Sequence, residues 1–288
     1  MPSYAVQKGK TLLSHVTRIK SANWHLSTRC NYNCKFCFSR KLDSEIKDLT
    51  EAHRILDNLK DIGIEKINLV GGEPLLHPLI FDIIKLAKTM GFVVSIVTNG
   101  HYLNQDLIRK LKPFIDWIGL SIDSADEEVE IKLGRGNGGH VKKVSELAKA
   151  IHDAGIKLKI NTTVTRLSWM EDMRPLIRYL KPDRWKVFQV LHILGQNDDN
   201  FNELSITDEQ FSYFKTLNHE PMEGIEPVFE GNKEMITSYL MISPSGLVMS
   251  NMDGANRTFL SLCDINSDNL SQIMDVQQYL ERDAIYPW

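Results

Sequence analysis

Short apolar segments rich in β-branched residues alternate with amphipathic segments from Asn23 onward. This alternation is typical of βα units arranged around a parallel sheet. The strands that it predicts are residues 23–28, 66–70, 93–98, 117–122, 157–164 and 185–191. The predicted helices, with apolar positions at helical spacing, are residues 50–62, 79–90, 105–111, 141–154 and 171–180.

Glycines mark three of the predicted helix ends. Gly63, Gly91 and Gly155 each follow a predicted helix and precede a predicted strand. Glycine most readily adopts the left-handed backbone conformation with which helices commonly end. Local chemistry therefore supports the same boundaries as the periodicity.

The number of βα units predicts the architecture. Six units are fewer than the eight of a complete barrel, so we expect an α/β fold with a partial (βα)6 barrel and an active face at the carboxyl ends of its strands. After Ile193 the rhythm stops, and the apolar segments 239–242 and 247–250 flank a Ser-Pro-Ser-Gly turn as in a hairpin. The predicted parts are an N-terminal tail (1–22), the partial barrel (23–193) and a C-terminal extension that covers the active site (194–288).

Composition excludes several classes of protein. The 288 residues are 42% hydrophobic and 25% charged, as in ordinary globular proteins, and carry a formal net charge of -3. No apolar run approaches the roughly 18 residues of a membrane-spanning helix, and residues 1–21 lack the apolar core of a secretory signal. We therefore expect a cytoplasmic protein without a membrane partner. Nucleic acid is also not expected as a partner, because binding its backbone requires excess positive charge.

Three of the four cysteines fall within eight residues, directly after the first predicted strand. Cys30, Cys34 and Cys37 have the spacing CxxxCxxC, whereas Cys263 stands alone. A zinc site usually takes four ligands from two separated pairs, and no histidine lies nearby in the sequence to complete a tetrahedron. An iron–sulfur cluster held by three cysteines leaves one iron free to coordinate a substrate or cofactor. The alternative is structural: a zinc knuckle or buried free cysteines.

A second motif follows the second predicted strand. The turn Gly71-Gly72-Glu73-Pro74 lets the backbone approach a ligand closely, and Glu73 adds a carboxylate suited to an ammonium group. Together with the cysteines, this turn resembles the signature of the radical S-adenosylmethionine (SAM) superfamily. The resemblance implies a barrel of the radical SAM type, a [4Fe-4S] cluster on the three cysteines and a glycine–glutamate turn that contacts the amino group of SAM.

The same resemblance places further SAM contacts on the loops and strands that follow. Asn99, Ser121 and Arg135 lie where the superfamily holds the ribose and the carboxylate of SAM. The guanidinium fork of Arg135 suits a carboxylate. For Asn99 and Ser121 the alternative is ordinary hydrogen bonding within a turn or strand.

Longer strings resemble the viperin family of antiviral nucleotide-modifying enzymes within this superfamily. The matching segments lie at 30–38, 66–74, 95–100, 126–129, 134–136, 159–161, 171–173 and 184–189. The last of them, Arg-Trp-Lys-Val-Phe-Gln, is the most particular. Vertebrate viperins carry an N-terminal amphipathic membrane helix that this sequence lacks, so we expect a prokaryotic-type member.

The resemblance to viperins also implies a reaction. Members of the family cleave SAM reductively to methionine and a 5′-deoxyadenosyl radical, which abstracts the 4′ hydrogen of a ribonucleoside triphosphate. The 3′ hydroxyl group is then lost, and the 3′-deoxy-3′,4′-didehydro product terminates polymerase extension. By the same analogy we expect CTP or UTP as the preferred substrate, and an electron donor of the flavodoxin or ferredoxin type and the iron–sulfur assembly machinery as partners.

Basic residues on three predicted strands offer a site for the triphosphate. Side chains two residues apart share one face of a strand, which pairs Lys66 with Asn68, Lys159 with Asn161, and Arg184 with Lys186. A cation inside a barrel is costly unless it is paired, and no carboxylate shares these strand faces. A polyanion would remove that cost, because phosphate oxygens accept charge-assisted hydrogen bonds. The alternative is that single lysines reach out into solvent.

Two aromatic residues in the C-terminal part complete the predicted site. Tyr239 opens the predicted hairpin and matches a family tyrosine near the sugar radical, with an implied role in returning a hydrogen atom or a proton after dehydration. Packing of the covering layer would explain it equally. Viperins also end in tryptophan, as here in Trp288, and in eukaryotic members this residue is linked to cluster delivery.

Two other functions stay open at the level of the sequence. A radical SAM enzyme that acts on a peptide or another small molecule would share both motifs, although such relatives commonly carry extra cysteine clusters in a C-terminal extension, where only Cys263 lies. A zinc-binding or nucleic-acid-binding module with structural cysteines is the other alternative. It predicts a colourless protein with a basic surface.

Overall fold

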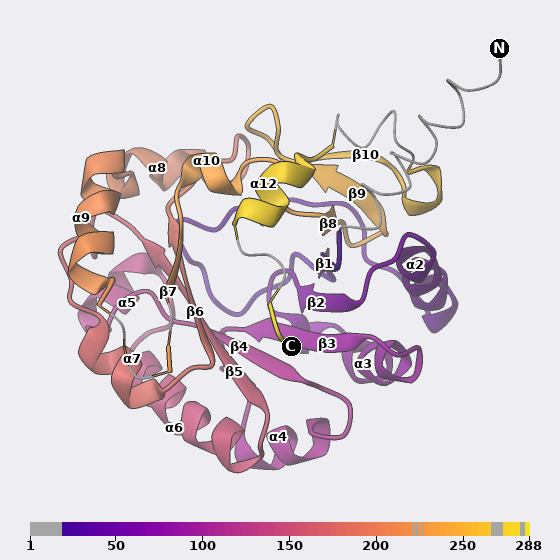
Figure 1. The fold of residues 1–288 in the computed structure, drawn as a ribbon, viewed down its shortest axis with the longest axis horizontal. Helices are drawn as coiled ribbons and strands as arrows, with labels where there is room; N and C mark the ends of the chain where they lie inside the picture. The colour runs from indigo at the N-terminus through magenta and orange to yellow at the C-terminus, as the bar shows by residue number, and fades with distance from the viewer. Residues whose placement is uncertain (1–18, 221, 223, 226, 266–272, 283–285) are drawn as a thin grey trace.

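A single curved sheet forms the centre of the computed structural model, which describes residues 19–220, 222, 224, 225, 227–265, 273–282 and 286–288. The strand order is β10-β9-β8-β1-β2-β3-β4-β5-β6-β7. All pairings from β8 through β1 to β7 are parallel, whereas β9 and β10 add antiparallel at the β8 side. Figure 1 shows the parallel strands curving into an arc with helices along its outer side. The predicted partial barrel is confirmed.

The first six strands are those that the sequence predicts. They are β1 (Ser21–His25), β2 (Lys66–Val70), β3 (Val93–Thr98), β4 (Trp117–Ser121), β5 (Lys157–Val164) and β6 (Arg184–Gln189). β1 ends three residues earlier than predicted, and the cause lies in the next loop. There the carbonyl groups of Ser27 and Arg29 accept hydrogen bonds from the N–H groups of Gly72 (2.6 Å) and Glu73 (2.7 Å).

Side chains alternate between the two faces of these strands. On β2, Ile67 and Leu69 are fully buried and belong to the hydrophobic core between the sheet and the helices. Lys66 and Asn68 point to the other face, which is the inside of the arc. The same alternation on the other strands gives the arc a polar interior with an apolar outer layer, so the inside of the arc is where polar ligands are met.

The helices on the outer side largely match the prediction. α2 (Leu49–Asp61), α3 (Ile80–Thr89), α4 (Gln105–Leu111), α6 (His140–Asp153) and α7 (Arg174–Leu180) lie within three residues of the predicted bounds. The predicted glycine ends are confirmed, since Gly63, Gly91 and Gly155 have φ values of 86°, 80° and 65°. The sequence analysis missed the short η1 (Pro74–Leu76) and α5 (Glu127–Leu133).

The sheet continues beyond the last predicted strand. After β6 the chain forms α8 (Asp198–Leu204), α9 (Asp208–Asn218), β7 (Pro227–Glu230) and α10 (Asn232–Met235). β7 pairs parallel with β6, with Val228 beside Lys186 and Glu230 beside Phe188. A four-residue edge strand that begins with proline gives almost no periodicity to detect, which is why it was not predicted.

The predicted hairpin is present and packs beside the first strand. β8 (Met241–Ile242) and β9 (Leu247–Ser250) pair antiparallel, followed by β10 (Arg257–Ser261), η2 (Leu262–Asp264) and α12 (Val276–Glu281). Trp24 of β1 donates an indole hydrogen bond of 3.1 Å to the carbonyl group of Ser243 in the hairpin turn. The side chains of Ser243 and Ser245 both bond to Asp43. The segment predicted as a covering extension therefore lengthens the same sheet at both edges, and the division into three parts stays a prediction.

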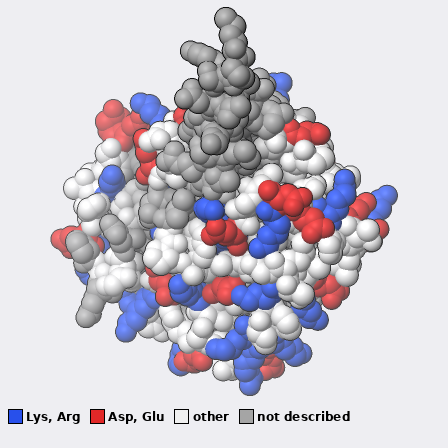
Figure 2. Space-filling view, turned by 45° about the vertical axis from the view of Figure 1, so that its right-hand side comes forward, with Lys and Arg blue, Asp and Glu red and all other residues white. Residues whose placement is uncertain are grey.

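Two further observations concern the charges on the surface and the character of the helices. On the face shown in Figure 2, basic and acidic side chains are interspersed rather than gathered into one basic patch. Among the described helices, none combines the length and the apolar character that crossing a membrane requires.

Candidate active site

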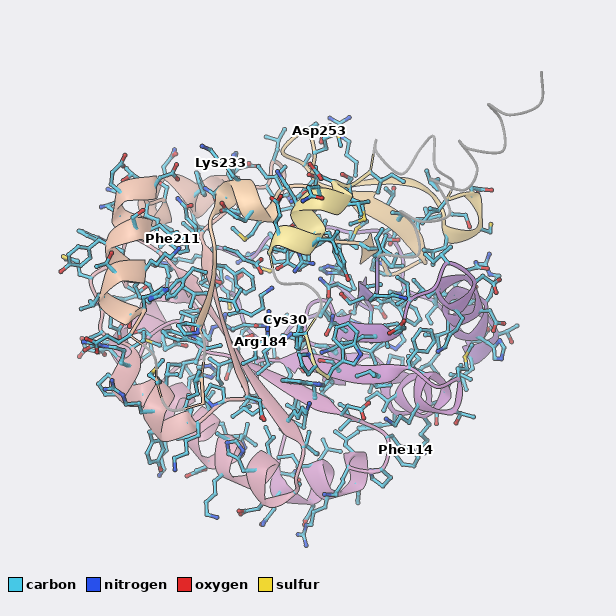
Figure 3. The ribbon with its side chains drawn as sticks, in the orientation of Figure 1. Cys30, Phe114, Arg184, Phe211, Lys233 and Asp253 are labelled. Carbon is cyan, nitrogen blue, oxygen red and sulfur yellow. The ribbon has the colours of Figure 1, made fainter. Side chains whose placement is uncertain are left out.

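A cavity of about 540 Å³ opens on the inside of the arc. Its volume lies in the range of small-molecule sites. Side chains at alternate positions of β1, β2, β5 and β6 line it, together with the cysteine loop and parts of the C-terminal segments. Figure 3 places Cys30 and Arg184 in the middle of the arc. The predicted residues that line the cavity are Cys30, Cys34, Cys37, Lys66, Asn68, Gly71, Gly72, Asn99, Ser121, Arg135, Lys159, Asn161, Lys186 and Tyr239.

The cysteine loop forms one wall of the cavity, and backbone hydrogen bonds to the end of α5 hold it in place. The N–H groups of Asn33 and Lys35 donate hydrogen bonds of 3.2 Å and 2.8 Å to the carbonyl groups of Gly134 and Leu133 at the end of α5. Gly134 is required at this contact, because a Cβ atom there would lie 2.2 Å from the carbonyl oxygen of Asn33. The unpredicted helix α5 is thus the support on which the loop rests.

The three thiols fit an iron–sulfur cluster better than a single ion. All three are free, and Cys30 is exposed to the cavity. Across the described residues, no group of three or more His, Cys, Asp and Glu side chains could hold one metal ion. A cluster has a different requirement, since each thiolate binds its own iron atom. Burial raises the pKa of the Cys34 thiol to about 12 and also raises that of Cys30, and the charge of Arg135 opposes this only in part, so a bound metal would be needed to stabilise the thiolates.

The two glycines of the Gly71–Glu73 turn serve a contact between backbones. A Cβ atom on Gly72 would lie 2.1 Å from the carbonyl oxygen of Arg29, and one on Gly71 would lie 2.7 Å from that of Ser27. Gly71 also has a φ value of 137°, in the region that favours glycine. The turn after β2 is therefore pressed against the segment that leads into Cys30, which positions both motifs at the same end of the cavity.

Glu73 lies behind the cavity wall rather than on it. Its carboxylate is fully buried and accepts hydrogen bonds from the hydroxyl group of Thr98 (2.7 Å) and from the N–H groups of Asn99 (2.9 Å) and Leu75 (3.2 Å). Burial raises its pKa, which these donors oppose. The side chain thus ties the glycine turn to the end of β3, and its predicted contact with the SAM ammonium group stays a prediction.

Asn99, Ser121 and Arg135 lie on the wall close to the cysteine loop. The Asn99 amide donates to Asn31 Oδ1 at 2.9 Å and lies 3.8 Å from the sulfur of Cys30. The Nε of Arg135 donates to Asp123 at 2.5 Å. It also lies 3.7 Å from the buried carboxylate of Glu130, so Arg135 meets two carboxylates in this structure that the sequence analysis did not single out.

Known proteins are similar to this chain along almost its whole length. Its sequence matches the family model of the Radical SAM superfamily over residues 24–180. An S-adenosylmethionine-dependent nucleotide dehydratase of Thermoplasmatales archaeon (strain ISO4-H5) is 42% identical over 96% of this chain and 99% of that protein. That of Flammeovirga pacifica is 34% identical over 96% and 99%, and that of Danio rerio is 30% identical over 94% and 79%.

The chain belongs to the S-adenosylmethionine-dependent nucleotide dehydratase family, the viperins. Solved structures agree on the fold. Streptococcus suis SuiB bound to S-adenosylmethionine has a TM-score of 0.68 at 20% identity and covers 97% of this chain and 72% of its own. The anSMEcpe structure with bound AdoMet has a TM-score of 0.67 at 17% identity, over 91% and 82%. As a radical SAM protein, this viperin uses a [4Fe-4S] cluster and SAM, which agrees with the thiol set described above.

The other half of the viperin cavity is basic. Lys66, Lys159, Arg184 and Lys186 are all at most 8% exposed, and Arg184 lies just behind the lining. Lys159 has room because its neighbour on β4 is Gly119, where a Cβ atom would lie 3.1 Å from the Lys159 side chain. Burial, followed by the charges of neighbouring cations, lowers the pKa of Lys66 to about 6 and that of Lys159 to about 7.

Two asparagines between these cations have unused acceptors. Asn68 and Asn161 both line the cavity, where the predicted strand alternation puts them. The side-chain Oδ1 atom of each is buried and receives no hydrogen bond from the described part of the chain. Buried acceptors without donors are rare in native proteins, so both are expected to meet a donor on a ligand.

One cation has a protein partner that the sequence analysis did not provide. The Nζ atom of Lys186 forms an ion pair with Glu230, and it donates a hydrogen bond of 2.9 Å to the hydroxyl group of Tyr239. The sequence analysis expected no carboxylate beside the basic residues. This is correct for the predicted strands that carry them, but wrong for the neighbouring part of the structure. The carboxylate comes from β7, the strand that was not predicted.

Sequence reasoning also missed several residues that line the cavity, although it had recognised the strand or the C-terminal part to which they belong. Asn23 and His25 line the cavity from β1, and the buried Nδ1 atom of His25 has no hydrogen-bond partner within the described residues. Period two along β1 would have identified both. Arg282 and Tyr286 line it from the C-terminal part, where no pattern in the sequence points inward.

The C-terminal segment reaches the basic half of the cavity. Lys66 donates a hydrogen bond of 2.6 Å to the hydroxyl group of Tyr286, and the guanidinium of Arg184 lies 3.8 Å from the centre of the Tyr286 ring. The ring of Trp288 lies 5.1 Å from the Lys66 Nζ atom. Trp288 therefore folds back toward the active site in this structure.

Proposed function

We propose that this protein converts a ribonucleoside triphosphate, CTP or UTP, into its 3′-deoxy-3′,4′-didehydro analogue, a terminator of polymerase extension in antiviral defence. The name of the relatives, nucleotide dehydratase, supports the reaction class. The observation that carries the proposal is that one cavity joins three thiols at one end to buried cations and unused amide acceptors at the other. A radical source and an anionic, hydroxyl-rich substrate would thus share one enclosed space.

In this proposal the thiol end of the cavity belongs to the cofactors. Cys30, Cys34 and Cys37 would hold the cluster, and Gly71, Gly72, Glu73, Asn99, Ser121 and Arg135 would position SAM. When bound, the cluster supplies the electron that splits SAM into methionine and the 5′-deoxyadenosyl radical. The protein contributes position: the cysteine loop rests on α5, and hydrogen bonds join the Gly71–Glu73 turn to that loop and to the end of β3.

The basic end would hold the substrate. Lys66, Lys159, Arg184 and Lys186 donate charge-assisted hydrogen bonds to phosphate oxygens, and Asn68 and Asn161 accept from sugar hydroxyl groups. Asn68 and Asn161 lie two residues closer than Lys66 and Lys159 to the carboxyl ends of β2 and β5, so the sugar would face the thiol end. Tyr239, which accepts a hydrogen bond from Lys186, would return a hydrogen atom or a proton to the sugar.

The partners in this proposal follow from the chemistry. A one-electron donor of the flavodoxin or ferredoxin type would reduce the cluster, and the iron–sulfur assembly machinery would build it. The formal net charge of -3 is the reason why nucleic acid is not proposed as a partner. A cytoplasmic location would give the protein all three: donor, assembly machinery and nucleotides.

A panel of nucleotides tests the proposal. The anaerobically reconstituted protein is incubated with SAM, dithionite and each of the four ribonucleoside triphosphates in turn, and 5′-deoxyadenosine and nucleotide products are measured by mass spectrometry. We expect CTP or UTP to raise 5′-deoxyadenosine formation at least about tenfold over SAM alone and to lose one water in the product. Cleavage of SAM that no nucleotide stimulates would contradict the proposed substrate class while leaving the radical SAM assignment intact.

A further inference from the structure

A buried carboxylate stands at the border of the basic half of the cavity. Glu230, the last residue of β7, is fully buried. One of its oxygens pairs with the Lys186 Nζ atom and lies 3.8 Å from the Arg282 guanidinium. The other accepts the hydrogen bond of the Tyr239 hydroxyl group. Glu230 thus contacts three side chains that line the cavity without lining it itself.

The carboxylate fixes the direction of the Tyr239 hydroxyl group. That group donates to Glu230 and accepts from Lys186 at 2.9 Å, so its proton and one lone pair both have assigned partners. The Arg282 guanidinium lies 3.6 Å from the centre of the Tyr239 ring and donates through Nε to the carbonyl group of Ser238 at 2.8 Å. The Tyr239 side chain is therefore held at its hydroxyl group by Glu230 and Lys186 and at the face of its ring by Arg282.

A carboxylate at this place has a cost for a protein that binds polyanions. A triphosphate close to Lys186 also lies close to Glu230, and the two negative charges repel each other. This repulsion alone would favour a neutral residue here. Glu230 must therefore provide something that a neutral residue does not.

We propose that Glu230 is a positioning residue of the substrate site, which orients the Tyr239 hydroxyl group and keeps Lys186 charged for the triphosphate. This inference rests on the proposed function, since it assumes that Lys186 meets phosphate. It assigns to β7 a part in the reaction that neither the sequence motifs nor the family name contains.

The charge on Lys186 depends on this one carboxylate. Burial lowers the pKa of Lys186 to about 8, Glu230 opposes this decrease, and the neighbouring cations add to it. The titratable and charged side chains near Lys186 are Glu230 from β7, Arg184 from its own strand, Lys159 from β5, Tyr239 and Arg282. Among them Glu230 is the anion, because burial and the Glu230 charge raise the pKa of Tyr239 well above its usual range.

The substitution Glu230→Gln separates the two effects of the carboxylate. It removes the repulsion between Glu230 and the triphosphate, so at pH values well below 8 the variant binds CTP at least as tightly as the wild type. It also removes the anion that raises the Lys186 pKa, so Lys186 loses its proton at a lower pH. Well above pH 8 the variant therefore binds CTP less tightly than the wild type.

The experiment measures CTP binding by calorimetry to the full-length, cluster-loaded protein at about pH 6 and about pH 9. If the Lys186 pKa falls by about one unit in Glu230→Gln, the ratio of the two dissociation constants becomes roughly five- to tenfold larger than in the wild type. Glu281→Gln, an exposed change beside Arg282, is the matched control and keeps the wild-type ratio. Equal ratios in Glu230→Gln and the wild type would overturn the inference.

Two further variants complete the design. Glu230→Asp restores the charge, so its ratio of dissociation constants returns toward the wild-type value; a ratio equal to that of Glu230→Gln would contradict the role of the charge. If Glu230→Gln does not fold, Tyr239→Phe is measured instead. Because it leaves the Glu230–Lys186 pair in place, it keeps the wild-type ratio while product formed per 5′-deoxyadenosine falls, and a changed ratio would count against the inference. A wild type that binds no CTP at any pH would instead remove the proposed function.

Discussion

At the scale of single residues, the two ends of the cavity suit ligands of opposite charge. The pKa values of the Cys30 and Cys34 thiols are raised because the effect of burial outweighs the opposing charge of Arg135 nearby. The buried lysines at the other end have lowered pKa values for the matching reason. Each end thus holds groups whose charged form its proposed ligand would stabilise, a metal cluster at one end and a polyphosphate at the other.

The thiol end gives the first prediction. Replacing Cys30, Cys34 or Cys37 by Ala should leave two ligands for the cluster, so brown absorbance, iron content and 5′-deoxyadenosine formation should all be lost. The measurement is iron content and absorbance after anaerobic reconstitution, followed by a SAM cleavage assay. Cys263→Ala is the control and should behave as the wild type. A variant of one of the three that still cleaves SAM would remove that cysteine from the ligand set.

How far single residues could be predicted depends on where they lie. Lys159 and Asn161 could be placed in the cavity because their strand is eight residues long and its alternation is clear. Glu230 could not, because β7 is too short for a detectable period. Arg282 reaches the cavity from beyond a helix of six residues, and only the tertiary packing brings it there.

At the scale of elements, the decisive contact lies between two loops. The segment between β1 and Cys30 and the turn after β2 are joined by backbone hydrogen bonds, with glycines at the points of closest approach. Sequence analysis interpreted Gly71 and Gly72 as space for a ligand. The structure adds that both glycines also make room for the backbone of the segment before Cys30. A local motif does not reveal this contact.

This contact gives the second prediction. In Gly72→Ala the new methyl group would lie 2.1 Å from the carbonyl oxygen of Arg29, so the segment that leads into Cys30 must move. We expect unfolding to become easier by about 1–3 kcal/mol and SAM binding to be lost. Thermal denaturation and equilibrium dialysis with SAM measure the two effects.

A second glycine supplies the control for this experiment. Gly195→Ala strains a residue with a φ value of 82° but meets no atom within 4 Å. It should lower stability by about 1–2 kcal/mol and leave SAM binding intact. Equal SAM binding by the two variants would show that the loop contact does not position the SAM site.

At the scale of the whole molecule, the fold was largely predictable from its periodicity. Six strands and five helices followed from apolar spacing and glycine ends, and the partial barrel followed from their number. The hairpin strands β8 and β9 were predicted as well, but β7 and the place of the extra strands at the edges of the sheet could not be. β7 is short, and β8 pairs with a strand more than two hundred residues away, a contact that no local pattern contains.

The summed charge of the cavity gives the third prediction. The pKa values of Lys66, Lys159 and Lys186 are lowered to about 6, 7 and 8, so these side chains are partly neutral near pH 7.5 in the empty cavity. A bound triphosphate restores their protons. Nucleotide binding should therefore take up protons and should weaken as pH rises from about 6 through 8. Calorimetry in two buffers with different ionisation enthalpies measures this uptake.

A lysine on β5 provides the test of this prediction, and an exposed lysine on α6 provides the control. Lys159→Met should weaken triphosphate binding by at least about tenfold and reduce the proton uptake, because it removes one titrating cation. Lys142→Met, an exposed change on α6, should change neither quantity. Wild-type proton uptake in Lys159→Met would assign the titration to other groups.

The hydrogen bond between Lys66 and Tyr286 joins residues 220 positions apart. On a ribosome that adds about 5–20 residues per second, the thiols near residue 30 emerge roughly ten to fifty seconds before Tyr286 is made. During that interval the nascent chain presents reactive sulfur without the pocket that later encloses it. The thiols are therefore open to oxidants during synthesis, before the C-terminal segment can pack beside the cavity.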